Sequence, residues 1–176
     1  MRQIIYSVAA SLDGYIARSD HSFDWIPMDP EVDFAAMFKP FDVMLMGRKT
    51  FEITQREQPE GGQPLYAGMA RYVFSKSSPA GKRHGVEFVN KPPSQWMNEL
   101  REKPGRDIWL MGGGDLAGEF LREDLIDGIS VAICPVVLGS GIPMFPAGFP
   151  QRQFRFVKQR VYQQSGIVMV DYDRDR

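Results

Sequence analysis

The chain has 176 residues, which fits a single domain over residues 1–176. Hydrophobic residues make up 43% and charged residues 24% of the sequence, so the composition is that of a folded globular protein and excludes extended disorder. The formal net charge of −1 excludes a strongly basic surface for nucleic acid.

The first part of the chain predicts a buried strand, a sharp turn and a helix. Residues 4–10 form a nearly continuous apolar run, which is typical of a strand buried on both faces of a sheet. Gly14 then permits a sharp change of direction, because glycine adopts positive φ without a steric penalty. Asp29 is expected to cap a helix that Pro40 ends.

The rest of the chain predicts strands that alternate with helices. A short apolar strand at residues 43–46 leads directly into a helix start at Gly47, and an irregular connection rich in glycine and proline follows over residues 54–70. Further strands are predicted at residues 71–75, 86–89, 107–111 and 129–137, and further helices at residues 93–101 and 115–121.

The tail predicts an antiparallel hairpin. Residues 154–158 and 167–171 alternate between apolar and polar side chains, and Ser165 and Gly166 supply a turn between them. Alternating strands and helices followed by an antiparallel end indicate the α/β class, with a sandwich built on a mixed sheet.

Several classes of protein are excluded by what the sequence lacks. One cysteine, Cys134, cannot form an intramolecular disulfide, and two histidines are too few for a structural zinc site, so no metal is expected. The start has no signal-peptide pattern, and the longest apolar stretch, residues 129–138, is too short to span a bilayer. We therefore expect a cytoplasmic protein with no membrane partner.

The first motif with chemical potential follows the strand at residues 43–46. Gly47, Arg48, Lys49 and Thr50 stand where a helix begins. A helix N-terminus has free N–H groups and a partial positive charge, and an arginine fork can bond two phosphate oxygens at once. The motif predicts phosphate binding as readily as it predicts a capped helix with cations facing solvent.

The second motif also joins a strand to a helix. Gly112, Gly113 and Gly114 precede Asp115 and Leu116, and three glycines let a diphosphate approach the backbone closely. The following strand carries no acidic residue at its end to hold a ribose, which argues against a Rossmann fold. Two phosphate-type turns in one small domain nevertheless favour a dinucleotide.

Other polar groups complete the candidate site. Ser75 and Lys76 end the strand at residues 71–75, where a hydroxyl and an ammonium group suit the 2′-phosphate that distinguishes NADP from NAD. Asp13 and Glu31 offer carboxylates, one of which can donate a proton if it is desolvated beside a cofactor ring. Taken alone, Ser75 and Lys76 fit a polar surface turn better, and the two carboxylates fit turn or solvated surface positions better.

In motif order and spacing the chain resembles the dihydrofolate reductase superfamily, and in particular the reductase domain at the C-terminus of the bifunctional riboflavin-biosynthesis deaminase-reductase. The matching segments are residues 11–17, 46–52, 75–76, 112–116 and 137–145. The resemblance implies a three-layer α/β/α sandwich with an antiparallel C-terminal hairpin. It also implies NADPH as the cofactor, bound across the carboxyl edge of the sheet by the glycine turns and by Ser75 and Lys76.

Departures from the family pattern leave the substrate open. A glutamate usually precedes the paired glycines of riboflavin reductases, and this chain has Met111 there. The deaminase motif is absent from the sequence. Glu31 lies sixteen residues before Gly47, which is similar to the acid of folate reductases, but no convincing arginine for a folate tail is present.

The leading hypothesis is an NADPH-dependent reductase that delivers hydride to a C=N or C=O bond of a small substrate. The alternatives are a dihydrofolate or pterin reductase and a non-catalytic nucleotide or pterin sensor on the same fold. Asp13 is the first candidate for the proton donor, with a pKa raised by desolvation, and Glu31 is the second. The resemblance implies a homodimer, because such reductase domains are commonly dimeric. Four aromatic residues of the C-terminal loop and hairpin either form an exposed apolar patch that supports a dimer or pack on their own sheet: Phe145, Phe149, Phe154 and Phe156.

Overall fold

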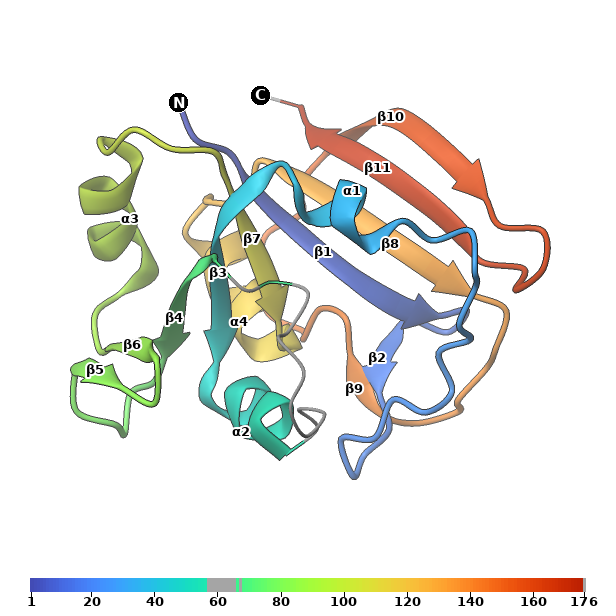
Figure 1. Ribbon diagram of the computed structural model, residues 1–176, viewed down its shortest axis with the longest axis horizontal. Helices are drawn as coiled ribbons and strands as arrows, with labels where there is room; N and C mark the ends of the chain where they lie inside the picture. Colours follow the sequence, from blue (N-terminus) through green and yellow to red (C-terminus); the bar gives the residue numbers. More distant parts are fainter. Residues whose placement is uncertain (57–65, 67, 176) are drawn as a thin grey trace.

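The computed structural model describes residues 1–56, 66 and 68–175. The strands of the main sheet in this part of the chain are β1 (Ile4–Ser11), β3 (Phe41–Gly47), β4 (Ala70–Phe74), β5 (Gly81–Arg83), β6 (Val86–Val89), β7 (Asp107–Gly112), β8 (Gly128–Cys134), β10 (Phe154–Val161) and β11 (Val168–Arg174). Their order in the sheet is β10–β11–β8–β1–β7–β3–β4–β6–β5 (Figure 1). A second, small sheet pairs β2 (Tyr15–Ala17) with β9 (Ile142–Pro143).

The centre of the main sheet is parallel and its edges are antiparallel. β8, β1, β7, β3, β4 and β6 run in the same direction. At one edge β11 pairs antiparallel with β8 and β10 with β11, and at the other edge β5 pairs antiparallel with β6. The predicted α/β class, the mostly parallel sheet and the terminal hairpin are confirmed.

Helices cover both faces of the sheet. On one face lie α1 (Phe34–Phe38) and α2 (Arg48–Arg56), where Phe51 packs in a cluster with Met44 and Trp109. On the other face lie α3 (Pro93–Arg101) and α4 (Gly114–Arg122), whose Trp96 and Phe120 pack on the opposite sides of the same strands. Burying such a side chain contributes about 1.5–3 kcal/mol to the free energy of folding. Because successive side chains of a strand point to opposite faces of the sheet, this burial on both faces stabilises a three-layer sandwich.

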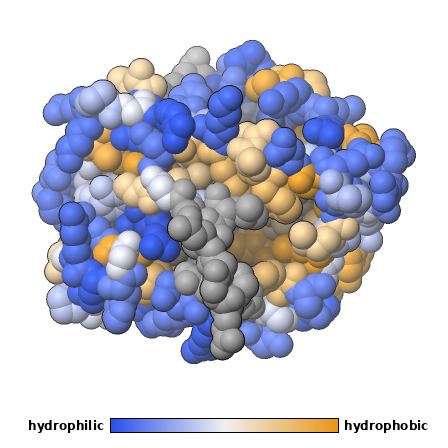
Figure 2. All heavy atoms as spheres, in the orientation of Figure 1, coloured by the Kyte–Doolittle hydropathy of each residue, from blue (hydrophilic) through white to orange (hydrophobic). Residues whose placement is uncertain are grey.

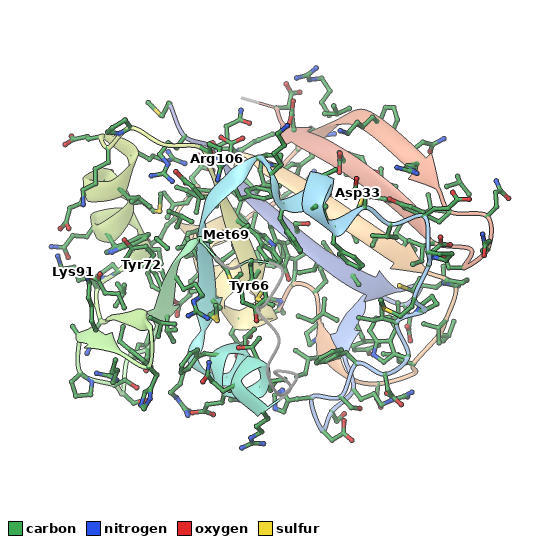
Figure 3. All side chains as sticks on the ribbon, in the orientation of Figure 1. Asp33, Tyr66, Met69, Tyr72, Lys91 and Arg106 are labelled. Atoms are coloured by element: carbon green, nitrogen blue, oxygen red, sulfur yellow. The ribbon has the colours of Figure 1, made fainter. Side chains whose placement is uncertain are left out.

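The helix predicted at Asp29 begins later than expected. α1 starts at Phe34, and the cap is Asp33, whose carboxylate accepts a hydrogen bond of 2.9 Å from the N–H of Ala36 (Figure 3). The carboxylate of Asp29 instead accepts 2.9 Å hydrogen bonds from the N–H groups of Glu31 and Ser165. The assignment of Asp29 as the cap was wrong, because this side chain ties its loop to the distant β10–β11 turn.

Further differences concern strand ends and short strands. The strand expected over residues 129–137 ends at Cys134, and Pro135, which follows, has no N–H to donate to a sheet. β2, β5 and β9 were missed, since runs of two or three residues carry too little periodicity to be recognised. Most of the predicted irregular connection, residues 57–65 and 67, lies outside the described residues, while α2 continues to Arg56.

The aromatic residues near the C-terminus are more buried than expected. Phe145, Phe149 and Phe154 are partly buried and pack against the main core cluster, and the ring centroids of Phe145 and Phe149 are 5.8 Å apart. Phe156 alone of the four is exposed, at 55%. Of the two alternatives, packing on the protein's own core therefore holds for three of the four residues, because the C-terminal loop folds back onto the core.

Candidate active site

A cleft of about 1370 Å³ lies at the carboxyl ends of the parallel strands. It is lined by the ends of β1, β3, β4, β6 and β7, by the first turns of α2 and α4, and by the segment that carries β2. On the face shown in Figure 2, hydrophobic side chains gather in a band across the middle, bordered by hydrophilic ones. The cleft is larger than the roughly 300–1,000 Å³ of an ordinary small-molecule site, so it has room for two ligands.

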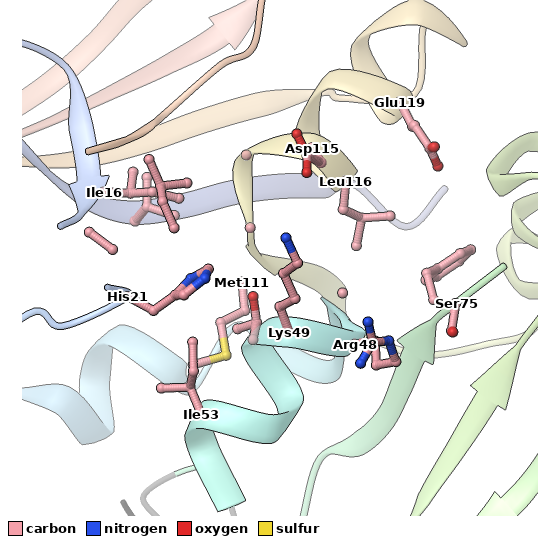
Figure 4. Close-up of a pocket in the computed structure, with 18 of the residues that line it drawn as sticks. Ile16, His21, Arg48, Lys49, Ile53, Ser75, Met111, Asp115, Leu116 and Glu119 are labelled. Atoms are coloured by element: carbon pink, nitrogen blue, oxygen red, sulfur yellow. The ribbon is translucent and has the colours of Figure 1, made fainter. Parts of the chain in front are cut away.

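The first predicted phosphate turn lies on this cleft. β3 ends at Gly47 and α2 begins at Arg48, so the free N–H groups of the helix face the cleft where Gly47, Arg48, Lys49 and Thr50 line it. Nine residues of helix stand behind this N-terminus and give it a partial positive charge. Figure 4 shows the Lys49 side chain directed into the middle of the cleft.

The second predicted turn lies beside the first. Gly112 has a φ of 132°, the Gly112–Gly113 peptide bond is cis, and Gly113 precedes the first residue of α4. A Cβ atom on Gly47 would lie 3.9 Å from the Gly112 oxygen, and one on Gly113 would lie 3.5 Å from Thr50 Oγ1. The sequence predicted that both turns bind one dinucleotide, and the structure places them side by side at one cleft, at the ends of the paired strands β3 and β7.

Gly114 has a separate, structural reason to be glycine. A Cβ atom there would lie 2.2 Å from the backbone oxygen of Pro143 in β9, which is far inside van der Waals contact. The first turn of α4 therefore packs directly on the strand that pairs with β2. Asp115 and Leu116 follow in the same turn and line the cleft, with Asp115 exposed and Leu116 buried.

The predicted cations at one end of the cleft are engaged with carboxylates. Lys76 Nζ lies 2.5 Å from Glu119 Oε1, and Arg48 Nη1 lies 2.5 Å from Glu52 Oε1. The Lys76 side chain is 87% exposed, so its ion pair is weak and easily exchanged for another anion. Among the residues that the structure describes, Lys49 has no ion-pair partner.

Ser75 is held by its own turn at the end of β4. Its hydroxyl donates to Ser78 Oγ at 2.9 Å and accepts from the Ser78 N–H at 3.1 Å. Its backbone N–H donates to the Val89 oxygen of β6 at 3.0 Å. Figure 4 shows Ser75, Arg48 and Glu119 at one end of the cleft. Together with Lys76, which pairs with Glu119, they define its polar end.

The two predicted proton donors do not lie on the cleft. Asp13 is exposed, and its carboxylate accepts hydrogen bonds from Ser11 Oγ at 2.6 Å and from the N–H groups of Gly139 at 2.7 Å and Leu138 at 3.1 Å. The hydrogen bond from Ser11, followed by those from the backbone, holds the pKa of Asp13 below its ordinary value. The predicted rise of this pKa was wrong, because Asp13 anchors a loop in solvent.

Glu31 is exposed as well and belongs to the loop before α1. Neither carboxylate is among the described residues that line the cleft. Their assignment as proton donors stays a prediction, and the geometry of the cleft does not favour it.

Opposite the polar end lies an apolar end that the sequence did not reveal. Ile16 comes from β2, Ile26 from the following loop, Ile53 from α2 and Met111 from β7. His21 lies among them, with its imidazole directed toward the cleft (Figure 4). These residues are scattered along the chain and share no motif. The sequence therefore contains no signal for this wall of the cleft, apart from the fact that residue 21 is a histidine.

Comparison with known proteins assigns this chain to a protein family. Residues 2–168 match the model of the RibD C-terminal domain. The chain belongs to this family. Within the RibD C-terminal family, the uncharacterised protein YyaP of Bacillus subtilis (strain 168) is 33% identical over 179 residues, which cover 97% of this chain and 94% of YyaP.

Solved structures with the RibD C-terminal fold superpose on the whole chain. A protein of Shewanella sp. PV-4, provisionally assigned to riboflavin biosynthesis, matches with a TM-score of 0.84 and 28% identity, covering 100% of each chain. RibD of Acinetobacter baumannii matches with a TM-score of 0.77 and 18% identity, covering 99% of this chain and 58% of RibD. The expected dihydrofolate reductase-like fold of a stand-alone reductase-domain relative is confirmed.

Membership of the RibD C-terminal family connects the chain with a reductase role in riboflavin biosynthesis at the level of the family. Met111, the residue before the paired glycines, lines the apolar end of the cleft. No helix in the described part of the chain has the length and hydrophobicity needed to cross a membrane.

Proposed function

We propose that the protein is an NADPH-dependent reductase that delivers hydride to a C=N or C=O bond of a small substrate, in the manner of 5-amino-6-(5-phosphoribosylamino)uracil reductase. The observation that carries the proposal is that two glycine-led helix N-termini lie side by side at one cleft. Each N-terminus attracts one anionic group, so two of them side by side suit the diphosphate of a dinucleotide.

The residues present fit such a cofactor. Gly47 and Gly113 have no side chain, and a Cβ atom at either position would narrow the space between the two turns. Lys49 adds a positive charge without an ion-pair partner among the described residues, and Ser75 and Lys76 offer a hydroxyl and an ammonium group at the polar end. The exposed carboxylate of Asp115 and the half-buried carboxylate of Glu119 oppose phosphate, so cofactor binding must displace Glu119 from Lys76.

When bound, the cofactor supplies the hydride. The protein has to bind the cofactor, orient the substrate and supply a proton to it. The N–H groups of α2 and α4 and the charges of Arg48 and Lys49 would hold the diphosphate, with Lys76 near a 2′-phosphate. The apolar wall at Ile53 and Met111 would exclude water from the reacting atoms, which strengthens every electrostatic interaction there.

A titration with NADPH and with NADH, followed by the fluorescence of the reduced nicotinamide, tests the proposal. We expect saturable binding with a preference for NADPH. Equal and millimolar binding of both cofactors would contradict it.

A non-catalytic nucleotide or pterin sensor on the same fold is the second candidate, favoured by Met111 at the position of the family glutamate. A sensor binds NADPH but shows no loss of nicotinamide absorbance with any dihydropterin, pterin or aminopyrimidine substrate. Robust turnover with one of these compounds would exclude the sensor and would also separate a pterin reductase from an aminopyrimidine reductase.

We also propose a homodimer in the cytoplasm. The edge strand β10 exposes Phe156 at 55% and Val157 and Val161 at 45% each, and apolar side chains on a sheet edge favour pairing with another copy. Light scattering at micromolar concentration should give about twice the monomer mass of 20.0 kDa. A mass near the monomer value would contradict the dimer.

A further inference from the structure

Among the residues that the structure describes, His21 is the ionisable side chain in the wall of the apolar end of the cleft. Figure 4 shows His21 beside Ile16, Ile53 and Met111, whereas Asp115, Glu119 and Arg48 lie toward the other parts of the cleft. The hydride transfer proposed above leaves negative charge on a nitrogen or oxygen atom, which needs a proton. Neither Asp13 nor Glu31 lines the cleft.

The loop around His21 holds it in place. The N–H of His21 donates to the Arg18 oxygen at 2.9 Å, the N–H of Arg18 donates to the Ser22 oxygen at 2.9 Å, and the Ser22 N–H donates to Asp20 Oδ1 at 2.9 Å. His21 has a φ of 71°, a left-handed conformation that is uncommon for residues other than glycine, asparagine and aspartate. This tight turn directs a half-buried side chain inward.

The imidazole is free to meet a ligand. Within the described part of the chain, no hydrogen bond or ion pair engages its ring nitrogens, whereas its backbone N–H donates to the Arg18 oxygen. The charged groups on the facing elements are Lys49 of α2 and Asp115 of α4, and those of its own loop are Arg18, Asp20 and Asp24. Imidazole is also the side chain best suited to give up a proton near neutral pH.

We propose that His21 is the catalytic acid that protonates the substrate, an inference that rests on the proposed reductase function. As the substrate carbon accepts hydride from the reduced nicotinamide, the π electron pair of the C=N or C=O bond moves to nitrogen or oxygen. That atom takes the proton from the imidazolium, whose N–H bond breaks. Both electrons of the new C–H bond would come from the bound reduced nicotinamide, and the neutral imidazole would regain a proton from water.

The chain contains its own control for this proposal. His84 is the other histidine of the sequence, it also has a left-handed backbone with a φ of 51°, and it is exposed in the turn between β5 and β6, away from the cleft. Asparagine adopts the left-handed region readily and cannot donate an imidazolium proton, so His21→Asn and His84→Asn are matched variants. Circular dichroism and the thermal midpoint establish that both fold.

The first experiment records the imidazole NMR signals of both histidines in the wild-type protein while NADPH and then a dihydropterin, as the C=N probe, are added. We expect the His21 signals to shift and the His84 signals to stay. If NADPH fails to bind, the reductase function fails and takes the His21 role with it. If NADPH binds but the His21 signals never move, the function stands and the His21 role is overturned.

The second experiment measures the reduction of whichever probe the wild-type protein turns over, across pH 5–9. His21→Asn should retain the Kd for NADPH and lose turnover by about 100-fold, together with the decline of wild-type turnover at alkaline pH. His84→Asn should match the wild type in both respects. Full turnover with an unchanged pH profile in His21→Asn would overturn the proposal while leaving the reductase function intact.

Discussion

The two ends of the cleft are built in different ways. The polar end depends on contiguous motifs, residues 47–50 and 112–116, in which glycine and a helix start expose backbone N–H groups. The apolar end depends on single side chains such as Ile16, Ile53 and Met111, which come from different elements. Binding by backbone is thus encoded locally, whereas binding by converging side chains depends on the topology of the sheet.

The largest expected effect concerns a glycine in the second of these contiguous motifs. Gly114→Ala should lower the free energy of unfolding by about 3 kcal/mol, because its methyl group meets the Pro143 oxygen, an atom of the backbone. Gly47→Ala is the control, since its methyl group would meet nothing closer than 3.9 Å. Urea unfolding of both variants measures the difference, and equal stability of the two would contradict the packing argument.

At the polar end, Arg48→Ala should weaken NADPH binding by about 1.5–3 kcal/mol if the guanidinium makes a charge-assisted bond to phosphate. That corresponds to a Kd raised roughly 10- to 150-fold. Arg56→Ala, at the far end of the same helix, should change the Kd little. Fluorescence titration compares the two, and equal affinities would show that Arg48 is a solvated cation.

At the apolar end, Met111→Glu should leave the Kd for NADPH within about twofold and weaken substrate binding roughly tenfold, about 1.4 kcal/mol, because a carboxylate is costly beside Ile53. Met111→Leu keeps the wall apolar and should retain both affinities. Steady-state kinetics separate the KM for substrate from that for cofactor. A large loss of cofactor affinity in Met111→Glu would mean that the two ends are not independent.

A smaller effect is expected at Lys76. Its side chain is 87% exposed, so Lys76→Ala should reduce the preference for NADPH over NADH by roughly 2- to 5-fold, in line with the 0.2–1 kcal/mol of an exposed ion pair. Glu119→Gln frees Lys76 and should shift the preference in the opposite direction. Parallel titrations with the two cofactors measure the ratio, and unchanged ratios would remove Lys76 from the phosphate site.

The smallest effect is a dependence of stability on pH. The pKa of Asp13 is lowered in the folded protein, chiefly by the Ser11 hydroxyl, so its contribution is present above the ordinary carboxyl value of about 4 and is lost as the pH falls through the lowered value. Asp13→Asn should therefore flatten the acid side of a plot of thermal midpoint against pH. Ser11→Ala should flatten it partly, and a steeper acid side in either variant would contradict the assignment.

The sequence predicted the architecture well because the central strands, such as β1 and β3, are nearly continuous apolar runs. Residues 86–89 and 93–101 were predicted with the bounds that β6 and α3 have. The error at Asp29 arose because Asp29 and Asp33 are equally good caps in isolation. Tertiary contact with Ser165 decides between them, and no local pattern reports that contact.

By itself, the sequence determined the fold class and the polar end of the cleft. A glycine at the end of a buried strand exposes the N–H groups of the next helix wherever that helix lies, so Gly47 and Gly113 could be recognised from their neighbours alone. The tertiary structure decided which side chains line the same part of the cleft and which carboxylates lie outside it. Asp13 turned out to anchor the loop at Gly139, and His21 to face Met111, because contacts between residues far apart in sequence follow from strand order and loop closure.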